Sequence, residues 1–234
     1  MTQATDKTLA EIAYKRIRED LLAGSLGAST RLRVNELKER YGLGLSPLRE
    51  ALLKLTSEGF VIAEGQRGFA VAPLSLGELA DITQTRQHIE AIALSESIDK
   101  GDADWEAAIM SAFHRLSRAP LPNGPSDAQA ILNWEQKHRA FHDSLIVACA
   151  SPWMIGFHSQ LVDHSERYRR ARLFSTVPAT QIARDIEMEH RAIMESVLSR
   201  DKQRACELMR DHLQRTATAA AQGLQREKNG APKI

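Results

Sequence analysis

The stretch SPLREALLKLTSEGFVIAEGQRGFAV, residues 46–71, decides the fold of the first third of the chain. Its first half predicts a helix, because a serine followed by proline suits a helix start and Leu48, Leu52 and Leu55 recur at helical spacing. Gly59 is a natural end for that helix. Two short β-prone runs, FVIAE and FAVAP, then flank the polar turn GQRG, a pattern typical of a β-hairpin.

Two further helices are expected before this stretch, over residues 7–23 and 34–41, with a glycine-containing turn at 42–44. The order helix, helix, turn, helix, hairpin is that of a winged helix-turn-helix DNA-binding domain. In that arrangement the third helix presents its first residues to base edges in the major groove, while the hairpin, called the wing, holds phosphates. We therefore assign residues 1–74 to such a domain.

Candidate DNA contacts lie on the third helix and on the wing. Ser46 and Arg49 occupy the first turns of the helix, and Arg67 sits at the hairpin tip between Gln66 and Gly68, whose missing side chain permits close approach. A single arginine is more often a solvated surface charge. Basic side chains outnumber acidic ones across the helix-turn-helix segment, however, which favours a DNA-binding face.

The composition bounds the class of protein. With 234 residues and a net charge of +1, the chain is long enough for two domains, and its total charge indicates neither nucleic acid nor membrane. No apolar run is long enough to cross a bilayer, and the N-terminus lacks the apolar core of a signal peptide. Cys149 and Cys206 belong to no paired motif and are interpreted as small core residues in a reducing compartment. A cytoplasmic location is expected.

From Ser75 onward the pattern becomes helical, and no strand is expected after Pro73. Ser75 and Glu78 form an S-x-x-E start signal for a long helix. Helices are expected over residues 75–100, 104–118, 127–150, 152–173, 179–199 and 201–223, with a frayed end at 226–234. The fold class is therefore mainly α: a winged helix-turn-helix with a small β-hairpin wing, then an all-α bundle of six or seven helices over residues 75–234.

Four histidines interrupt the apolar stripes of this bundle. His138 and His142 lie four residues apart on the stripe of one predicted helix, His190 on that of a second, and His212 on that of the last. A lone histidine on an apolar face is usually a hydrogen-bonded core residue, and a hydrogen-bonded polar cluster remains an alternative. Four together favour a divalent metal ion, Zn, Ni, Fe or Mn, because unpaired imidazoles are costly to bury and these ions all accept imidazole.

Arg86 is a charged residue on the apolar stripe of the 75–100 helix and needs a carboxylate partner. Glu90, one turn on, is the structural candidate, and the carboxylate of a small effector held by the guanidinium is the functional one. The residues alone leave both open. Tyr168 and Arg172, one turn apart, are candidates for the far end of a dicarboxylate pocket and equally for ordinary helix-surface residues.

The segment RLRVNELKERYGLGLSPLREALLKLTSEGFVIAEGQRGFAV, residues 31–71, resembles the DNA-binding domain of GntR-family bacterial transcription regulators through PLREAL, L-x-x-E-G-F and R-G-F-x-V. The resemblance implies operator binding as a homodimer, with Arg49 as a principal DNA contact. It assigns supporting contacts to Ser46, to Arg31 and Arg33 in the basic segment, and to Gln66, Arg67 and Gly68. Many relatives have arginine where this chain has Leu45, so a different half-site preference is expected.

The helical part resembles the FCD ligand-sensing domain of the FadR subfamily. Its motifs are matched by Phe141-His142, by His190 in EHRAI, by His212 in MRDHL, and by Arg86 to Glu90 in R-x-x-I/L-E. The resemblance implies a metal site and an effector site that includes the arginine. His138 stands where the family commonly has Asp or Asn, which removes an anionic ligand. NWEQKHRAFHDSLIVACASPW and SERYRRARLF are similar to glutarate-responsive members, which suggests glutarate as effector.

These observations favour a metabolite-responsive transcriptional repressor that a small carboxylate, bound next to a metal, releases from its operator; it is not expected to be an enzyme. A metal-dependent hydrolase with an accessory DNA-binding domain is an alternative, but it needs a general base. The sequence has no H-E-x-x-H motif, and the nearest acids, Asp143 and Glu189, lie at the edges of the stripes. A dimeric DNA-binding protein whose bundle senses nothing is the third possibility.

Overall fold

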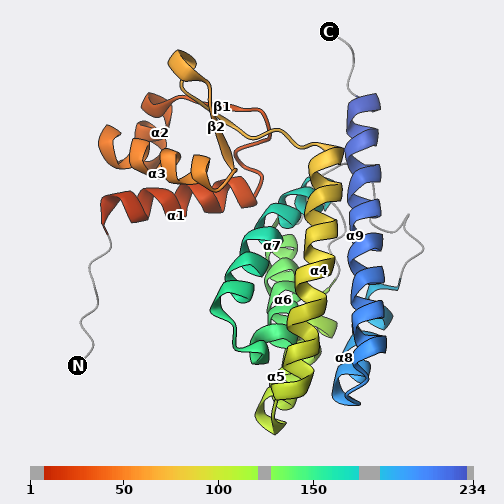
Figure 1. Ribbon diagram of the computed structural model, residues 1–234. Helices are drawn as coiled ribbons and strands as arrows, with labels where there is room; N and C mark the ends of the chain where they lie inside the picture. Colours follow the sequence, from red (N-terminus) through yellow and green to blue (C-terminus); the bar gives the residue numbers. More distant parts are fainter. Residues whose placement is uncertain (1–7, 121–127, 174–184, 231–234) are drawn as a thin grey trace, which may run out of the picture. The chain divides into compact units, whose positions relative to one another are not determined.

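The computed structural model describes residues 8–120, 128–173 and 185–230, which form nine α-helices and a three-stranded antiparallel sheet (Figure 1). The chain divides into two compact units, Met1–Ser75 and Leu76–Ile234. Parts of the predicted helices and of the frayed end fall on residues 7, 127, 179–184 and 231–234, which lie outside the described residues.

The first unit contains three helices, α1 (Leu9–Leu22), α2 (Val34–Tyr41) and α3 (Leu45–Ser57). Thr8 caps α1 through a capping box with Glu11, and α2 ends at Gly42, whose φ of 65° places it in the left-handed region that favours glycine.

The predicted start of α3 at Ser46 needs a correction. The helix begins at Leu45, and Gly44 is its N-cap residue in an extended conformation. Since Ser46 is already inside the helix, its hydroxyl cannot cap, and it donates instead to Glu50 at 3.3 Å. Leu48, Leu52 and Leu55 are completely buried, which confirms the predicted inward face of this helix.

The predicted hairpin is confirmed, with β2 (Val61–Ala63) and β3 (Phe69–Val71) paired antiparallel around a short 3-10 turn at Gly65–Arg67. A third strand, β1 (Arg31–Leu32), pairs with the other edge of β3, so the strand order is β1-β3-β2. The sequence did not predict β1, because two residues are too few to show an alternating pattern.

The second unit is a bundle of helices. They are α4 (Leu76–Lys100), α5 (Ala103–Ser117), α6 (Ala128–Ile146), α7 (Pro152–Leu173), α8 (Ile186–Leu198) and α9 (Lys202–Gly230). The predicted end of the last helix at residue 223 is wrong, because α9 continues to Gly230. A glycine inside a helix weakens it only by about 1 kcal/mol, and good helix formers follow Gly223.

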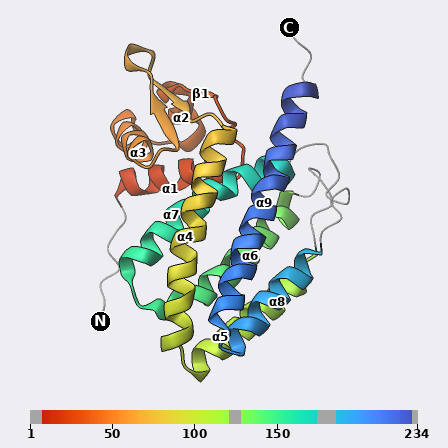
Figure 2. The ribbon, with the colours of Figure 1, turned by 45° about the vertical axis from the view of Figure 1, so that its right-hand side comes forward.

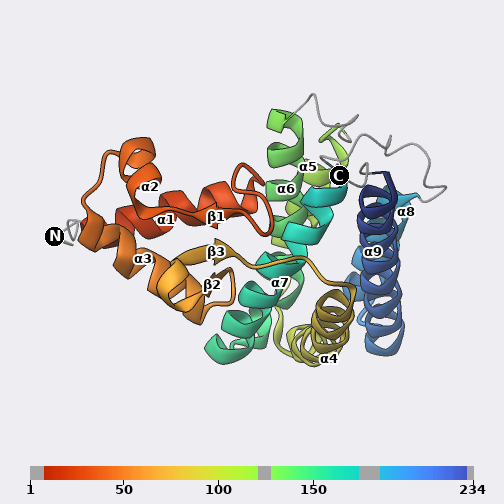
Figure 3. The same ribbon diagram turned by 90° about the horizontal axis from the view of Figure 1, so that it is seen from above.

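Within the bundle, α4 packs against both α7 and α9, as Figures 1 and 2 show, and Figure 3 gives the view from above, in which α4 is strongly foreshortened. The helix α6 packs on α5, and α8 packs on α9 and α5. Cys149 and Cys206 are buried free thiols, as the sequence predicted. Among the described residues, no helix is both long and apolar enough to span a membrane.

Candidate metal and effector site

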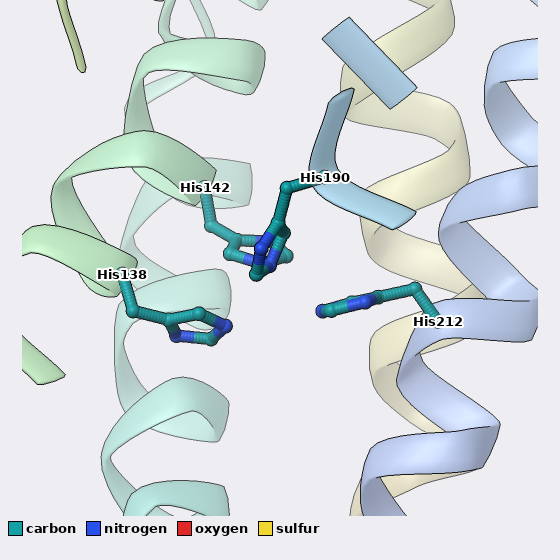
Figure 4. A group of neighbouring side chains, drawn as sticks. All are labelled: His138, His142, His190 and His212. Carbon is teal, nitrogen blue, oxygen red and sulfur yellow. The ribbon is translucent and has the colours of Figure 1, made fainter. Parts of the chain in front are cut away.

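The four predicted histidines meet inside the bundle. His138 and His142 come from α6, His190 from α8 and His212 from α9, and their rings point toward one another (Figure 4). One ring nitrogen of each lies within 4.8 Å of the corresponding nitrogens of the other three. Each of these residues is at most 5% exposed. Three helices therefore place four candidate ligand atoms close together in the buried interior of the bundle.

The spacing of one pair of these nitrogens is that of two ligands on one metal ion. The Nε2 atoms of His142 and His190 are 3.3 Å apart. Zinc–nitrogen bonds of about 2.0–2.1 Å at tetrahedral angles put two donor atoms about 3.3 Å apart. The ring of His138 also stacks on Trp134, at 4.7 Å between centroids, which fixes its orientation.

The electrostatic surroundings of His138 and His142 favour the neutral form of both imidazoles. Burial, together with the neighbouring imidazoles, lowers the pKa of His138 and of His142 well below 6.5. The Nδ1 atoms of both are buried without a hydrogen-bond partner in the described part of the chain. Neutral imidazole is the form that binds metal, so the donor set matches a divalent ion of the zinc, nickel or iron type.

The predicted structural partner of Arg86 is present. Its Nε donates to Glu90 Oε1 at 2.7 Å and its Nη1 to Ser165 Oγ at 2.9 Å, and both charged side chains are at most 4% exposed. Burial alone would raise the pKa of Glu90, but the charges of Arg86 and His158 outweigh it and lower that pKa. Glu90 and Arg86 are also among the charges that act on His142, so the pair lies near the histidine cluster.

Tyr168 and Arg172 are the other two residues predicted to bind the effector. Tyr168 is completely buried, and its hydroxyl donates to the carboxylate of Glu78. Arg172 lies in α7, but its side chain lies outside the described residues.

Sequence reasoning missed three ionisable residues of this region, Glu135, His158 and Arg169. Arg169 is buried and donates to Glu135 at 2.7 and 3.2 Å, and it is among the charges that act on His138. His158 is 2% exposed, with its nitrogens 3.0 Å from Asp143 and 3.3 Å from Glu90. A helical stripe was available as a signal, because residues 158, 162, 165 and 169 lie on one face of α7.

The acids considered as a general base both have other partners. Asp143 contacts His158, and Glu189 Oε2 lies 3.0 Å from Nδ1 of His212. Outside the cluster, His88 of α4 and His114 of α5 are exposed.

In the first unit, the predicted DNA contacts lie on exposed positions where their side chains are described. Ser46 and Arg49 are exposed at the start of α3, next to Leu45, which is 42% exposed. Arg33 is exposed and pairs with Glu36 at 2.8 Å.

The wing joins the basic segment through its backbone. Arg31 donates through two nitrogens to the carbonyl oxygen of Arg67, at 2.8 and 3.2 Å. Gly68 has φ 93° and ψ −131°, a conformation that only glycine adopts readily. The backbone of Gln66 lies in the turn, and its side chain is outside the described residues.

Comparison with known proteins agrees with this architecture. The family model described as "Bacterial regulatory proteins, gntR family" matches residues 9–71, and that described as "FCD domain" matches residues 81–215. The solved structure of McbR/YncC from E. coli has a TM-score of 0.74 to this chain at 20% identity, covering 93% of this chain and 99% of the other. It shows the same fold.

Two relatives are similar over most of their length. The HTH-type transcriptional regulator BphR of Paraburkholderia xenovorans is 38% identical over 219 residues, which cover 94% of this chain and 88% of BphR. The HTH-type transcriptional repressor GlaR of Escherichia coli is 35% identical over 200 residues, covering 86% of this chain and 90% of GlaR. The chain therefore belongs to the GntR family of bacterial regulatory proteins, with a C-terminal FCD domain, and is a DNA-binding transcriptional regulator.

Proposed function

We propose that this regulator is a homodimeric repressor that a small carboxylate releases from operator DNA, the carboxylate binding beside a divalent metal ion in the FCD domain. The observation that carries the proposal is the convergence of His138, His142, His190 and His212 within 4.8 Å in the interior of the bundle. The similarity to GlaR, which is named a repressor, supports repression as the direction of control.

The four histidines would hold the ion through neutral nitrogen atoms. A bound divalent ion supplies positive charge and open coordination positions to a carboxylate oxygen. His138 replaces the Asp or Asn common in the family, so no ligand charge offsets that of the ion. An all-nitrogen donor set favours Zn, Ni or Fe over Mn, which prefers oxygen ligands.

Arg86 is the proposed anchor for the effector. In the absence of effector, Glu90 satisfies its guanidinium at 2.7 Å. An effector carboxylate offers the same acceptor atoms, so it can take the place of Glu90 at the guanidinium, and Glu90 then keeps His158, at 3.3 Å, as its ionic partner. The far carboxylate of a dicarboxylate is assigned to Tyr168 and Arg172, and the resemblance to glutarate-responsive members makes glutarate the first compound to test.

The DNA-binding side of the proposal uses the exposed residues of the winged helix. Arg49 and Ser46 contact the major groove from the start of α3. Supporting contacts come from Arg31, Arg33, Gln66, Arg67 and Gly68. Release requires only that the effector bind one state of the dimer more tightly, by about 1–3 kcal/mol of coupling free energy.

Elemental analysis followed by an operator titration tests the proposal. The purified protein should contain about one divalent ion per chain. Glutarate should raise the dissociation constant for operator DNA, selected from a random duplex pool and followed by fluorescence anisotropy, only while metal is bound. His142→Ala should lose both the metal and the glutarate response, whereas His114→Ala, which changes an exposed histidine of α5, should keep both.

The alternatives give different results in the same experiments. A bundle that serves only as a scaffold shows no shift with any dicarboxylate, with or without chelator. A metal-dependent hydrolase turns over substrate when excess metal is added. Metal at full stoichiometry in His142→Ala would remove this residue from the ligand set.

A further inference from the structure

One histidine of the cluster, His212, is in hydrogen-bonding distance of a carboxylate. Nδ1 of His212 lies 3.0 Å from Glu189 Oε2, and the other oxygen of the same carboxylate accepts from Arg215 at 3.2 Å. Glu189 precedes His190 on α8, whereas His212 and Arg215 belong to α9. Successive helical side chains diverge by about 100°, so His190 faces the cluster while Glu189 reaches across to the neighbouring helix.

This contact determines which nitrogen of His212 carries the proton. An ionised carboxylate only accepts hydrogen bonds, so Nδ1 must be the donor. When the ring is neutral, its lone pair is then on Nε2, the nitrogen on the side of the other imidazoles. By contrast, the Nδ1 atoms of His138 and His142 have no hydrogen-bond partner among the described residues, so no contact of that kind fixes their tautomers.

We infer that Glu189 is a positioning residue of the metal site: it holds His212 in the Nδ1–H tautomer, orients its Nε2 as a ligand and strengthens that nitrogen as a donor. The inference rests on the proposed metal site. Carboxylates hydrogen-bonded to ligand histidines act in this way, and their removal typically costs about 10–100-fold in metal affinity. At 13% exposure, the Glu189 side chain is largely shielded from water, which would otherwise compete for the same nitrogen.

Arg215 contributes less than His212 to holding the Glu189 carboxylate in place. Its side chain is 59% exposed, so its ion pair with Glu189 is screened by solvent and adds little energy. A role of Glu189 as a simple surface ion pair with Arg215 therefore predicts no effect on metal binding when Glu189 is removed.

Zinc affinity of the variants tests the inference, measured by competition with a chromophoric chelator. Glu189→Ala should weaken Zn²⁺ binding about 10–100-fold. Glu189→Gln keeps an acceptor oxygen but loses the charge, and should fall between Glu189→Ala and wild type. Glu187→Ala is the matched control, because Glu187 lies on the same helix, is exposed and pairs with Arg191 at 2.8 Å. It should bind zinc as wild type does.

A second readout does not depend on affinity. In ¹⁵N-histidine spectra of the metal-free protein, His212 should show the Nδ1–H tautomer in wild type and in Glu189→Gln, and a mixture of tautomers in Glu189→Ala. Wild-type zinc affinity in both Glu189 variants would overturn the inference. If Glu189→Ala does not fold, unchanged affinity in Glu189→Gln overturns it alone.

The two proposals fail separately. If wild type binds no zinc, or if His142→Ala binds it equally well, the metal site itself is wrong. If wild type binds zinc through these histidines and the Glu189 variants match it, only the role of Glu189 is wrong.

Discussion

Replacing Arg86 by methionine should leave the buried carboxylate of Glu90 without its main ionic partner. Glu90 is 1% exposed and accepts from Arg86 Nε at 2.7 Å, and its other described ionic partner is His158 at 3.3 Å. Breaking one side of a buried ion pair typically costs about 3–5 kcal/mol. For a chain of this size, each kcal/mol lowers the melting temperature by about 2–4 °C, so Arg86→Met should melt about 6–20 °C below wild type.

A second variant separates two causes of the lower stability, the unpaired carboxylate of Glu90 and the lost packing of the Arg86 side chain. Arg86→Met/Glu90→Gln removes both charges, so no ion is left unpaired in the interior. It should recover at least about half of the lost free energy of unfolding, because replacing both members of a buried pair is often nearly neutral. Thermal and urea unfolding of chelator-treated protein measure this. A double variant no more stable than Arg86→Met would refute the charge argument.

The same double variant tests whether Arg86 binds the effector carboxylate or serves only as the ionic partner of Glu90. It should fold and bind operator DNA as wild type does. It should not respond to glutarate, because the guanidinium of Arg86 that would bind the effector carboxylate is gone. Gln84→Ala, an exposed change on the same helix, should respond normally. A full glutarate response in the double variant would mean that Arg86 serves only its internal partner.

Three further predictions use other parts of the chain. Arg49→Ala, at an exposed position, should leave unfolding unchanged but raise the dissociation constant for operator DNA by about 5–150-fold per half-site, measured by anisotropy; unchanged affinity contradicts its role. Gly68→Ala should destabilise the first unit by about 1–3 kcal/mol in urea, because φ of 93° strains an alanine although its Cβ meets nothing within 4 Å, whereas Gly156→Ala, also without neighbours but in a helix, should not destabilise. Burial lowers the pKa of His158, but its two carboxylate partners outweigh this and raise it above 6.5, so its contribution is complete below that pH and is lost as pH rises through the folded pKa. In chelator, His158→Gln should therefore lose more stability relative to wild type at about pH 6 than at about pH 9, and an equal loss at both pH values contradicts the assignment.

Much of the site was predictable because it interrupts a simple pattern. A histidine is conspicuous on a stripe of apolar residues, and the spacing of His138 and His142 fixes a common helix face. The hairpin was predictable for the same reason, since a polar turn separates two short β-prone runs. The two-residue strand β1 offered no period at all, and its pairing with β3 depends on a contact between distant parts of the chain.

The charged residues of α7 were not predictable, because a charge-rich helix normally has a solvated face. The helix α7 packs against α4, α6 and α9, so charged side chains on several of its faces are covered. Asp163, Glu166, Arg169 and Arg170 are all buried. Sequence alone does not tell how many sides of a helix are covered, and that number decides whether ERYRRAR is a surface or an interior.

The same buried charges link the two proposed ligands. Glu90 already neutralises Arg86, and Glu135 neutralises Arg169, so the interior near the histidines carries little unbalanced charge. A divalent ion on four neutral nitrogens adds two positive charges there, and an uncompensated charge in a dry interior is costly. A bound carboxylate removes part of that cost. Metal and carboxylate should therefore each raise the affinity for the other by the same factor, and this factor should shrink when His138→Asp supplies an anion from the protein itself.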